Sequence, residues 1–370
     1  MGLWLVSTAA NSWVQRFARA VEAAEEEATQ QSAEDIDVDR PAANSFKGLS
    51  PRRQHASQLM AHEWMTEVPH DLASNWYVAC RPDGQRCLVV ATGGKTTSRL
   101  RNGALLHTFP SALPSGSPTA QSTAQGPTVL DCIFQDATRT YWVLDAITWN
   151  GYVLADCNAE CRLDFWVQAK LAEMQHLAGT MPFHAVPFTP CTKDGLQAAH
   201  SGAVPFERDG CLFLHRQGLY TIGSSPLALV WKDAQCSRYL LDTAADGLVP
   251  QQQQLTLKWQ IDGTVATEDD PPVTLGRMPS SFGQSLGRKA RPGLLLKFAL
   301  GPGGIIFSDG IPTGADISFT GPANQRRGRA DSFSKTLFQH LARTQPLLLN
   351  HLLAALEHQP AEEEGTHGCH

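Results

Sequence analysis

Hydrophobic residues alternate with polar ones over short stretches in most of this chain, which is the pattern of half-buried β-strands. The stretches 76–80 and 87–91, joined by Pro82-Asp83-Gly84, predict a β-hairpin. Residues 141–145 predict a strand that ends in a turn at Asn150-Gly151. Further strands are predicted over residues 211–214, 227–231, 255–261 and 294–300, the last followed by a turn at 301–304.

A helical period appears in four places. Residues 1–24 repeat Trp13, Phe17 and Val21 every four positions, and residues 51–64 begin with a proline that a first helical turn accepts. Residues 161–177 predict a helix with Phe165, Ala169, Leu171 and Met174 as its apolar positions, and residues 330–356 predict one that Pro346 breaks or kinks. Short strands mixed with a few helices indicate the α+β class.

Composition divides the chain into three parts. Residues 25–40 are acidic with few large apolar side chains, so we expect a disordered linker after the first helix. We predict an N-terminal region over 1–54, a central domain over 55–245 and a C-terminal extension of unassigned role over 246–370. The Pro/Ser/Gly/Gln-rich stretch 114–127 predicts a loop inside the central domain.

Charge and cysteine content exclude several functions. The formal net charge of −6 provides no general attraction for nucleic acid, although a local pocket would tolerate it. No stretch is apolar for long enough to cross a membrane, and the start of the chain does not read as a secretory signal. The nine cysteines are scattered, as is typical of reduced thiols in a cytosolic or nuclear protein. We predict neither a cofactor nor a metal site.

The hexapeptide Arg81-Pro82-Asp83-Gly84-Gln85-Arg86 resembles the Lys-x-Asp-Gly-x-Arg signature of covalent nucleotidyltransferases, with arginine in the place of the lysine. Arginine stays protonated and cannot attack a phosphate, but its planar fork of donors can bind one. Residues 141–151 and 207–213 match two further motifs of that superfamily in the same order. The resemblance implies mainly antiparallel sheets of the capping enzyme and ligase type, in a protein that binds a nucleotide and is not an enzyme.

A narrower resemblance, to the snurportins, covers roughly residues 33–235. It includes 58–64, 67–72, 109–116, 128–133, 190–192 and 205–210. Snurportins are import adaptors of spliceosomal ribonucleoproteins. The resemblance implies recognition of the 2,2,7-trimethylguanosine cap of U small nuclear RNAs, importin-β and an export receptor as partners, no membrane, and shuttling between nucleus and cytoplasm.

A trimethylguanosine cap offers a cationic ring, apolar methyl groups and an anionic triphosphate. The resemblance implies Trp231 as the aromatic face, although it lies one residue later than in the family and a core tryptophan is the alternative. Trp64 is the second candidate for that face. The other residues implied are His62, whose charge would follow pH near neutrality, the turn Gly84-Gln85, and the cations Arg81, Arg86 and Arg101, which otherwise read as solvated surface charges.

The importin-β-binding segment of snurportins is a helix rich in arginine, and residues 1–60 hold six Lys/Arg against eight Asp/Glu. Either the chain starts downstream of that segment, or import uses another surface. Two alternatives to a cap receptor stay open. One is an active guanylyltransferase or ligase relative that reacts through Lys95, and the other is an RNA-processing factor with this fold and another ligand.

Overall fold

The structure is a computed structural model, and it describes residues 58–121, 124–174, 181–244, 246–286, 291–325 and 328–357. The predicted N-terminal helix, the acidic linker and the first part of the predicted 51–64 helix lie outside these residues. The chain contacts define two compact units. One consists of Met1–His62 and Ala73–Leu229, and the other consists of Glu63–Leu72 and Val230–His370. Each unit is described by itself.

The first sheet has the strand order β1-β12-β11-β2-β10. The strand β1 (Met60–Trp64) occupies positions for which the sequence predicts a helix, and that prediction is wrong. Pairing with β12 overrides the local helical pattern, as tertiary context commonly does. The other bounds are β2 (Trp76–Pro82), β10 (Thr189–Pro190), β11 (Arg208–His215) and β12 (Gly223–Trp231), which confirm the strands predicted over 211–214 and 227–231.

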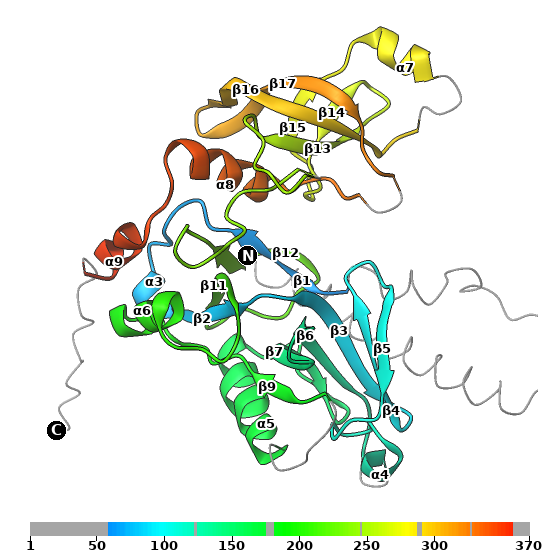
Figure 1. The fold of residues 1–370 in the computed structure, drawn as a ribbon, viewed down its shortest axis with the longest axis vertical. Helices are drawn as coiled ribbons and strands as arrows, with labels where there is room; N and C mark the ends of the chain where they lie inside the picture. Colours follow the sequence, from blue (N-terminus) through cyan, green and yellow to red (C-terminus); the bar gives the residue numbers. More distant parts are fainter. Residues whose placement is uncertain are drawn as a thin grey trace, which may run out of the picture. The chain divides into compact units, whose positions relative to one another are not determined.

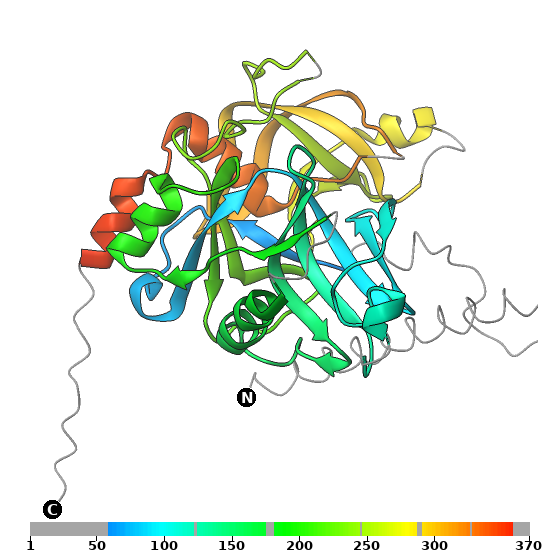
Figure 2. The ribbon, with the colours of Figure 1, turned by 60° about the horizontal axis from the view of Figure 1, so that its bottom comes forward.

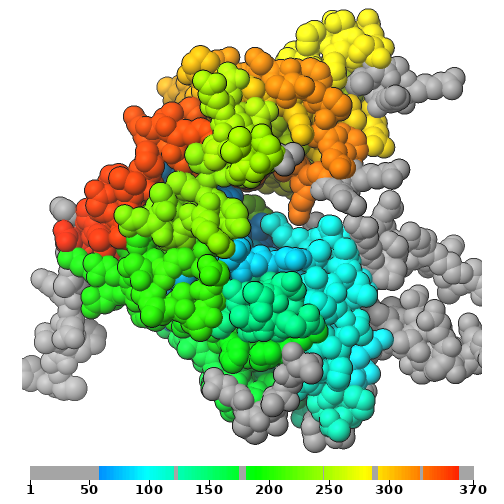
Figure 3. Space-filling view, viewed as in Figure 1, coloured from blue at the N-terminus to red at the C-terminus, as the bar shows by residue number. Residues whose placement is uncertain are grey.

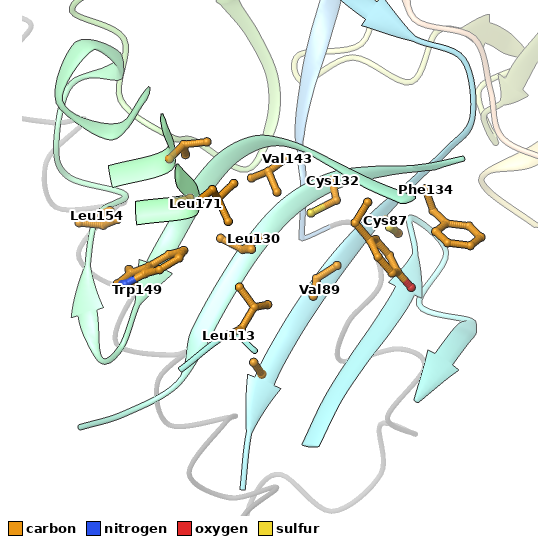
Figure 4. Packing of buried hydrophobic residues seen from close by; sticks show 14 of the residues in the cluster. Cys87, Val89, Leu113, Leu130, Cys132, Phe134, Val143, Trp149, Leu154 and Leu171 are labelled. Carbon is orange, nitrogen blue, oxygen red and sulfur yellow. The ribbon is translucent and has the colours of Figure 1, made fainter. Parts of the chain in front are cut away.

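The second sheet has the order β5-β4-β3-β6-β7-β8, with β9 (Phe183–Ala185) parallel to β7. Its inner face carries the main core of the first unit, which includes Val89, Leu130 and Val143, with Leu171 packed over them (Figure 4). The strand bounds are β3 (Gln85–Thr92), β4 (Lys95–Leu100), β5 (Leu105–Phe109), β6 (Thr128–Gln135), β7 (Thr140–Trp149) and β8 (Tyr152–Val153). The strand and turn predicted over 141–151 are therefore confirmed.

The predicted hairpin over residues 76–91 is wrong, although both of its strands exist. The strand β2 belongs to the first sheet and β3 to the second, so the turn between them carries the chain from one sheet to the other. Gly84 makes this crossing possible, since its φ is +150° and a Cβ there would lie 2.4 Å from the Phe134 carbonyl oxygen. The true hairpin joins β3 to β4 through Gly93-Gly94, both with positive φ, as a two-residue hairpin loop requires.

Helices cover the second sheet and one edge of the first (Figures 1 and 2). The predicted 161–177 helix is a π-helix, η1 (Cys161–Gln168), continued by α5 (Ala169–Met174). Its buried apolar positions are Leu163, Val167 and Leu171, whereas Phe165, one of the apolar positions of the predicted helix, is 62% exposed. The change follows from the wider π-turn, which shifts the buried stripe. The remaining helices are α3 (Leu72–Asn75), α4 (Pro118–Gln121) inside the predicted loop, and α6 (Lys193–Ser201).

The second unit has a sheet of its own, with the order β15-β14-β13-β16-β17. Leu257, Trp259, Leu275, Leu296 and Phe298 form its core. The bounds are β13 (Gln254–Trp259), β14 (Thr264–Ala266), β15 (Thr274–Arg277), α7 (Ser280–Leu286), β16 (Leu294–Ser308), β17 (Ile311–Pro322), α8 (Phe333–Thr344) and α9 (Leu349–Glu357).

Two predictions from the sequence concern residues of this unit. The interval between α8 and α9 confirms the helix break predicted near Pro346. The turn predicted at 301–304 is wrong, because β16 continues through those residues with a register shift between Leu300 and Ile305. Glycine absorbs this bulge, since a Cβ at Gly301 would lie 2.3 Å from Asp316 Oδ2.

Mainly antiparallel sheets with a few helices confirm the α+β class. All cysteines within the described residues are free thiols. Among the same residues, no helix is long and apolar enough to cross a membrane.

Candidate functional site

Arg86, the last residue of the nucleotidyltransferase-like signature, forms a two-point ion pair with Asp131. The Arg86 Nε donates to Asp131 Oδ1 at 3.0 Å, and Nη2 donates to Oδ2 at 2.6 Å. Arg86 lies at the start of β3 and Asp131 lies on the neighbouring β6, a strand whose eight residues are all buried. Two parallel N–H···O bonds fix the guanidinium plane, so this arginine is anchored by the fold itself.

His62 is the next group in the chain of contacts. The Arg86 Nη1 lies 2.8 Å from His62 Nδ1, and because arginine has only donors, Nδ1 accepts and the ring proton sits on Nε2. Burial, followed by the charges of Arg86, Arg81 and Arg101, holds the pKa of His62 well below its ordinary value. The prediction that the charge of His62 follows pH near neutrality is therefore wrong. His62 is a neutral ring with a fixed N–H donor.

A second buried ion pair lies beside the first. Arg162 Nε and Nη2 donate to Asp145 Oδ1 and Oδ2, both at 2.9 Å. Asp145 lies opposite Asp131 in the register between β7 and β6, so two carboxylates meet across the strands and each has its own arginine. Asp145 therefore compensates the charge of a buried arginine.

Tyr220 joins the two ion pairs. Its hydroxyl donates to Asp131 Oδ2 at 2.8 Å and accepts from the Met60 backbone N–H at 3.0 Å, while the Arg162 guanidinium lies 5.9 Å from the centre of its ring. Burial and the Asp131 carboxylate raise the pKa of Tyr220, so it remains a neutral donor. We call this group, Arg86, Asp131, Tyr220, Arg162 and Asp145, the paired-charge cluster.

Arg81 occupies the position of the nucleophilic lysine, and the structure turns it toward Asp209. The two side chains form an ion pair between β2 and β11. The Asp209 carboxylate is largely buried, so this pair ties the two strands together and compensates the charge of Arg81. Phosphate contact by Arg81 remains a prediction, but this arginine does not offer an uncompensated charge.

The remaining predicted residues of this unit are on its surface. Gly84 and Gln85 are exposed at the crossing turn, and Arg101 is exposed in the turn that follows β4. Lys95, the nucleophile of the enzyme alternative, is exposed beside Gly94 at the opposite end of β3 from Arg86. Thr92, which pairs with Lys95, lies six positions after Arg86 on β3, and six positions correspond to about 20 Å of strand.

The two predicted aromatic residues belong to the second unit. Trp231 is completely buried, and its Nε1 donates to the Leu347 carbonyl oxygen at 3.0 Å. Trp231 therefore has the burial of the core tryptophan that the sequence left open as the alternative to a cap-facing ring. Trp64 is partly exposed; its ring centre lies 4.7 Å from that of Phe338 and 5.6 Å from Lys232 Nζ. As a cap-stacking residue, Trp64 remains a prediction.

Sequence reasoning missed the partners of the predicted arginines. Asp131 lies within the motif at residues 128–133, and it could have been found as a lone carboxylate in a strand of apolar residues. A buried charge of that kind requires a partner. Arg162 and Tyr220 had no comparable signal, because their role depends on strands brought together from distant parts of the chain.

The fold is thus α+β with mainly antiparallel sheets, and Arg81 stands where the nucleotidyltransferase signature that the sequence resembles has its lysine. Residues 58–233, a little under half of the chain, match the family model described as the Snurportin1 m3G cap-binding domain. The resemblance to the snurportins is thus confirmed over this segment.

Solved structures to which the chain is similar are DNA ligases. They include mycobacterial DNA ligase D complexed with ATP and MES, at 13% identity, with 74% of this chain and 96% of that chain covered and a TM-score of 0.33. The Chlorella virus DNA ligase-adenylate is 11% identical over 72% of this chain and 100% of that chain, with a TM-score of 0.33. The ATP-dependent DNA ligase of bacteriophage T7 in complex with ATP is 11% identical, with 73% and 100% covered and a TM-score of 0.35. Likenesses this remote say nothing about the activity of this chain.

Proposed function

We propose that the first unit binds the 2,2,7-trimethylguanosine cap of U small nuclear RNAs. The match of residues 58–233 to the Snurportin1 m3G cap-binding domain carries this proposal. Replacement of the signature lysine by Arg81 supports binding without covalent chemistry, because a guanidinium has no lone pair for attack on phosphorus.

The described side chains have different roles in such a site. The paired-charge cluster acts as the scaffold, since its arginines are bonded to carboxylates and cannot supply full charges to a ligand. Arg86 orients His62, which presents its Nε2–H to a base edge or phosphate oxygen. The exposed turn at Gly84 and Gln85 lets a ligand approach the backbone, and the exposed Arg101 supplies positive charge for the triphosphate.

A fluorescence titration with trimethylguanosine triphosphate, monomethylguanosine triphosphate and uncapped GTP tests the proposal. We expect the trimethylated ligand to bind most tightly. Arg101→Ala should weaken its binding about tenfold, or ~1.4 kcal/mol. The matched control is Arg139→Ala, which removes an exposed arginine from the β6–β7 turn. Equal binding of all three ligands would contradict cap recognition. Equal loss in the two arginine variants would contradict a specific role for Arg101.

We further propose that the chain acts as an import adaptor for small nuclear ribonucleoproteins and shuttles between nucleus and cytoplasm. The match of residues 58–233 to the Snurportin1 m3G cap-binding domain supports this role, and the resemblance implies importin-β and an export receptor as the corresponding partners. Because residues 1–60 are not rich in arginine, we expect that fragment to bind importin-β weakly. A pull-down with the 1–60 fragment and with the whole chain tests both expectations. Tight, salt-sensitive binding of the fragment would show that a dense arginine array is not needed. No capture of importin-β by the whole chain would contradict the adaptor role.

A further inference from the structure

The strands of the second unit follow an order that identifies their architecture. β13 pairs with both β14 and β16, while β14 also pairs with β15 and β16 with β17. β15 packs back against β17, where a Cβ on Gly276 would lie 2.8 Å from Ile317 Cδ1. The five strands thus return on themselves as a small barrel, and α7 connects the third strand to the fourth. This is the arrangement of the OB fold, whose members bind oligonucleotides or oligosaccharides.

A groove of about 530 Å³ lies where β15, α7 and β17 meet. Its lining contains two accessible aromatic rings, Phe282 of α7 and Phe319 of β17, whose centres are 5.4 Å apart. Phe319 is 44% exposed, and its ring also makes an edge-to-face contact with Phe298 of the core at 5.9 Å between centres. A partly exposed aromatic ring that is fixed by such contacts can stack on an unpaired base.

A cation stands at the edge of the same groove. Arg277 is the last residue of β15 and is exposed, and its Nη1 donates to the carbonyl oxygen of Asp262. Asp262 lies in the β13–β14 loop, which corresponds to one of the two loops that border the ligand site of OB folds. Within the described part of the chain this is the single hydrogen bond of the Arg277 side chain, whereas the Arg277 backbone pairs with Thr264 of β14. The guanidinium therefore retains donors for a phosphate.

The charge along this part of the chain is opposite to that of the whole. Between residues 277 and 329 there are eight basic residues and two acidic ones, Asp309 and Asp316, in a chain with a net charge of −6. This local excess suits a polyanion. The four basic residues that the structure describes are all exposed: Arg277, Arg291, Lys297 and Arg329. Figure 3 shows the yellow and orange surface that α7, β16 and β17 form in this unit.

Three acidic residues of the unit already have partners within it. Glu268 pairs with Lys258 at 3.0 Å, and Asp269 accepts a hydrogen bond from the Phe333 backbone N–H at 2.6 Å. Asp316 accepts from the Gly303 backbone N–H at 2.9 Å. These bonds reduce the repulsion that the carboxylates would exert on a phosphate chain.

We propose that this barrel binds single-stranded nucleic acid, with bases stacked on Phe319 and Phe282 and a phosphate held by Arg277. The barrel topology, the open aromatic platform and the local positive charge each point to this ligand. The inference does not depend on cap recognition, because every residue that carries it belongs to the second unit.

The test uses the full chain and a fluorescein-labelled, uncapped oligouridylate of about ten nucleotides, a length within the range that OB folds occupy. Fluorescence anisotropy at low salt should show binding that weakens steeply as salt rises. Phe319→Ala and Arg277→Gln should each weaken it at least fivefold. The control is Phe165→Ala, which removes an exposed phenylalanine (62% exposed, against 44% for Phe319) from the first unit. Arg277→Gln changes a surface residue and keeps the test valid if Phe319→Ala fails to fold.

The outcomes separate this inference from the cap proposal. Trimethylguanosine triphosphate in excess should leave the oligouridylate bound, and Arg101→Ala should not affect it. Absence of binding at low salt would overturn the inference, as would equal losses in Phe319→Ala and Phe165→Ala. Equal affinity for a duplex of the same sequence would exclude base stacking. Displacement by polyglutamate as effective as displacement by RNA would identify an acidic protein as the partner. Failure of cap binding alone would leave the inference intact.

Discussion

Asp131 binds Arg86 through both of its carboxylate oxygens, from Nε at 3.0 Å and from Nη2 at 2.6 Å. The arginine of the nucleotidyltransferase-like signature is therefore directed into the fold. The bond from Tyr220 to the same carboxylate adds a third donor and completes its compensation. The effect of changing Arg86 should accordingly appear first in stability and only indirectly in ligand binding.

Removing one partner of this pair should destabilise the protein strongly. We expect Arg86→Ala, and separately Asp131→Asn, to lower the free energy of unfolding by about 3–5 kcal/mol, because the remaining charge stays buried without its partner. Urea denaturation followed by tryptophan fluorescence measures this. The double variant Arg86→Met, Asp131→Leu should recover much of the loss, whereas the surface control Arg101→Ala should change stability by less than about 0.5 kcal/mol. Two single variants as stable as the wild type would disprove the buried pairing.

The neutral state of His62 makes stability depend on pH. The pKa of His62 is lower in the folded protein than in the unfolded chain, where it is about 6.5. The unfolded chain therefore takes up a proton first, and the stability contributed by neutral His62 is lost as pH falls below about 6.5 toward the folded pKa. Between pH 7 and pH 5 the wild type should lose up to ~1.4 kcal/mol per pH unit from this group.

Urea denaturation of wild type and His62→Gln at several pH values checks this prediction. The difference in stability between the two proteins should shrink or reverse as pH falls. His70→Gln, which changes an exposed histidine, is the control. Parallel pH profiles for the wild type and His62→Gln would show that His62 titrates in the same way in the folded and unfolded states.

Trp231 should behave as a core residue. Truncation to alanine removes a fully buried indole and its bond to Leu347, so Trp231→Ala should cost about 3–5 kcal/mol of stability. Cap affinity per folded molecule should be unchanged. Trp64→Ala measured alongside tests the other aromatic candidate from the sequence, and unchanged cap affinity would exclude it. A large loss of affinity with unaltered stability in Trp231→Ala would instead restore it as a ligand-stacking residue.

No covalent adduct should form with GTP or ATP and a divalent metal. Arg81 replaces the nucleophilic lysine and is paired with Asp209, while Lys95 lies at the far end of β3. Incubation with α-labelled nucleotide followed by denaturing electrophoresis measures this. A label that survives denaturation and disappears in Lys95→Ala would establish the enzyme alternative.

The sequence predicted individual strands better than their partners. The strands β2, β3, β7, β11 and β12 follow from local alternation and turn residues. The pairing of β2 and β3 was wrong because Pro82-Asp83-Gly84 has the composition of a hairpin turn, whereas the direction of the chain after Gly84 is set by its contact with Phe134 on β6. Strand β1 was missed for a similar reason, since only its pairing with β12 distinguishes it from a helix.

For the candidate site, too, individual residues were easier to predict than their partners. Local motifs and family resemblance identified Arg81, Arg86 and His62, and the structure brings Arg86 and His62 into contact. Their electrostatic state was not predictable, because it depends on Asp131 and Asp209, which reach them from β6 and β11. The burial of Trp231 likewise depends on Leu347, more than a hundred positions later.

The crossing at Gly84 has a consequence for how the first unit forms. All strands of the second sheet come from one continuous segment, 85–185, whereas β2 and β10, which flank that segment, pair with each other in the first sheet. The second sheet therefore relies on contacts that are comparatively local in sequence. The first sheet can close only after a loop of roughly a hundred residues has brought its two halves together, which is entropically costly. Such a chain should fold in order, with the inserted sheet forming early and the first sheet setting the overall rate.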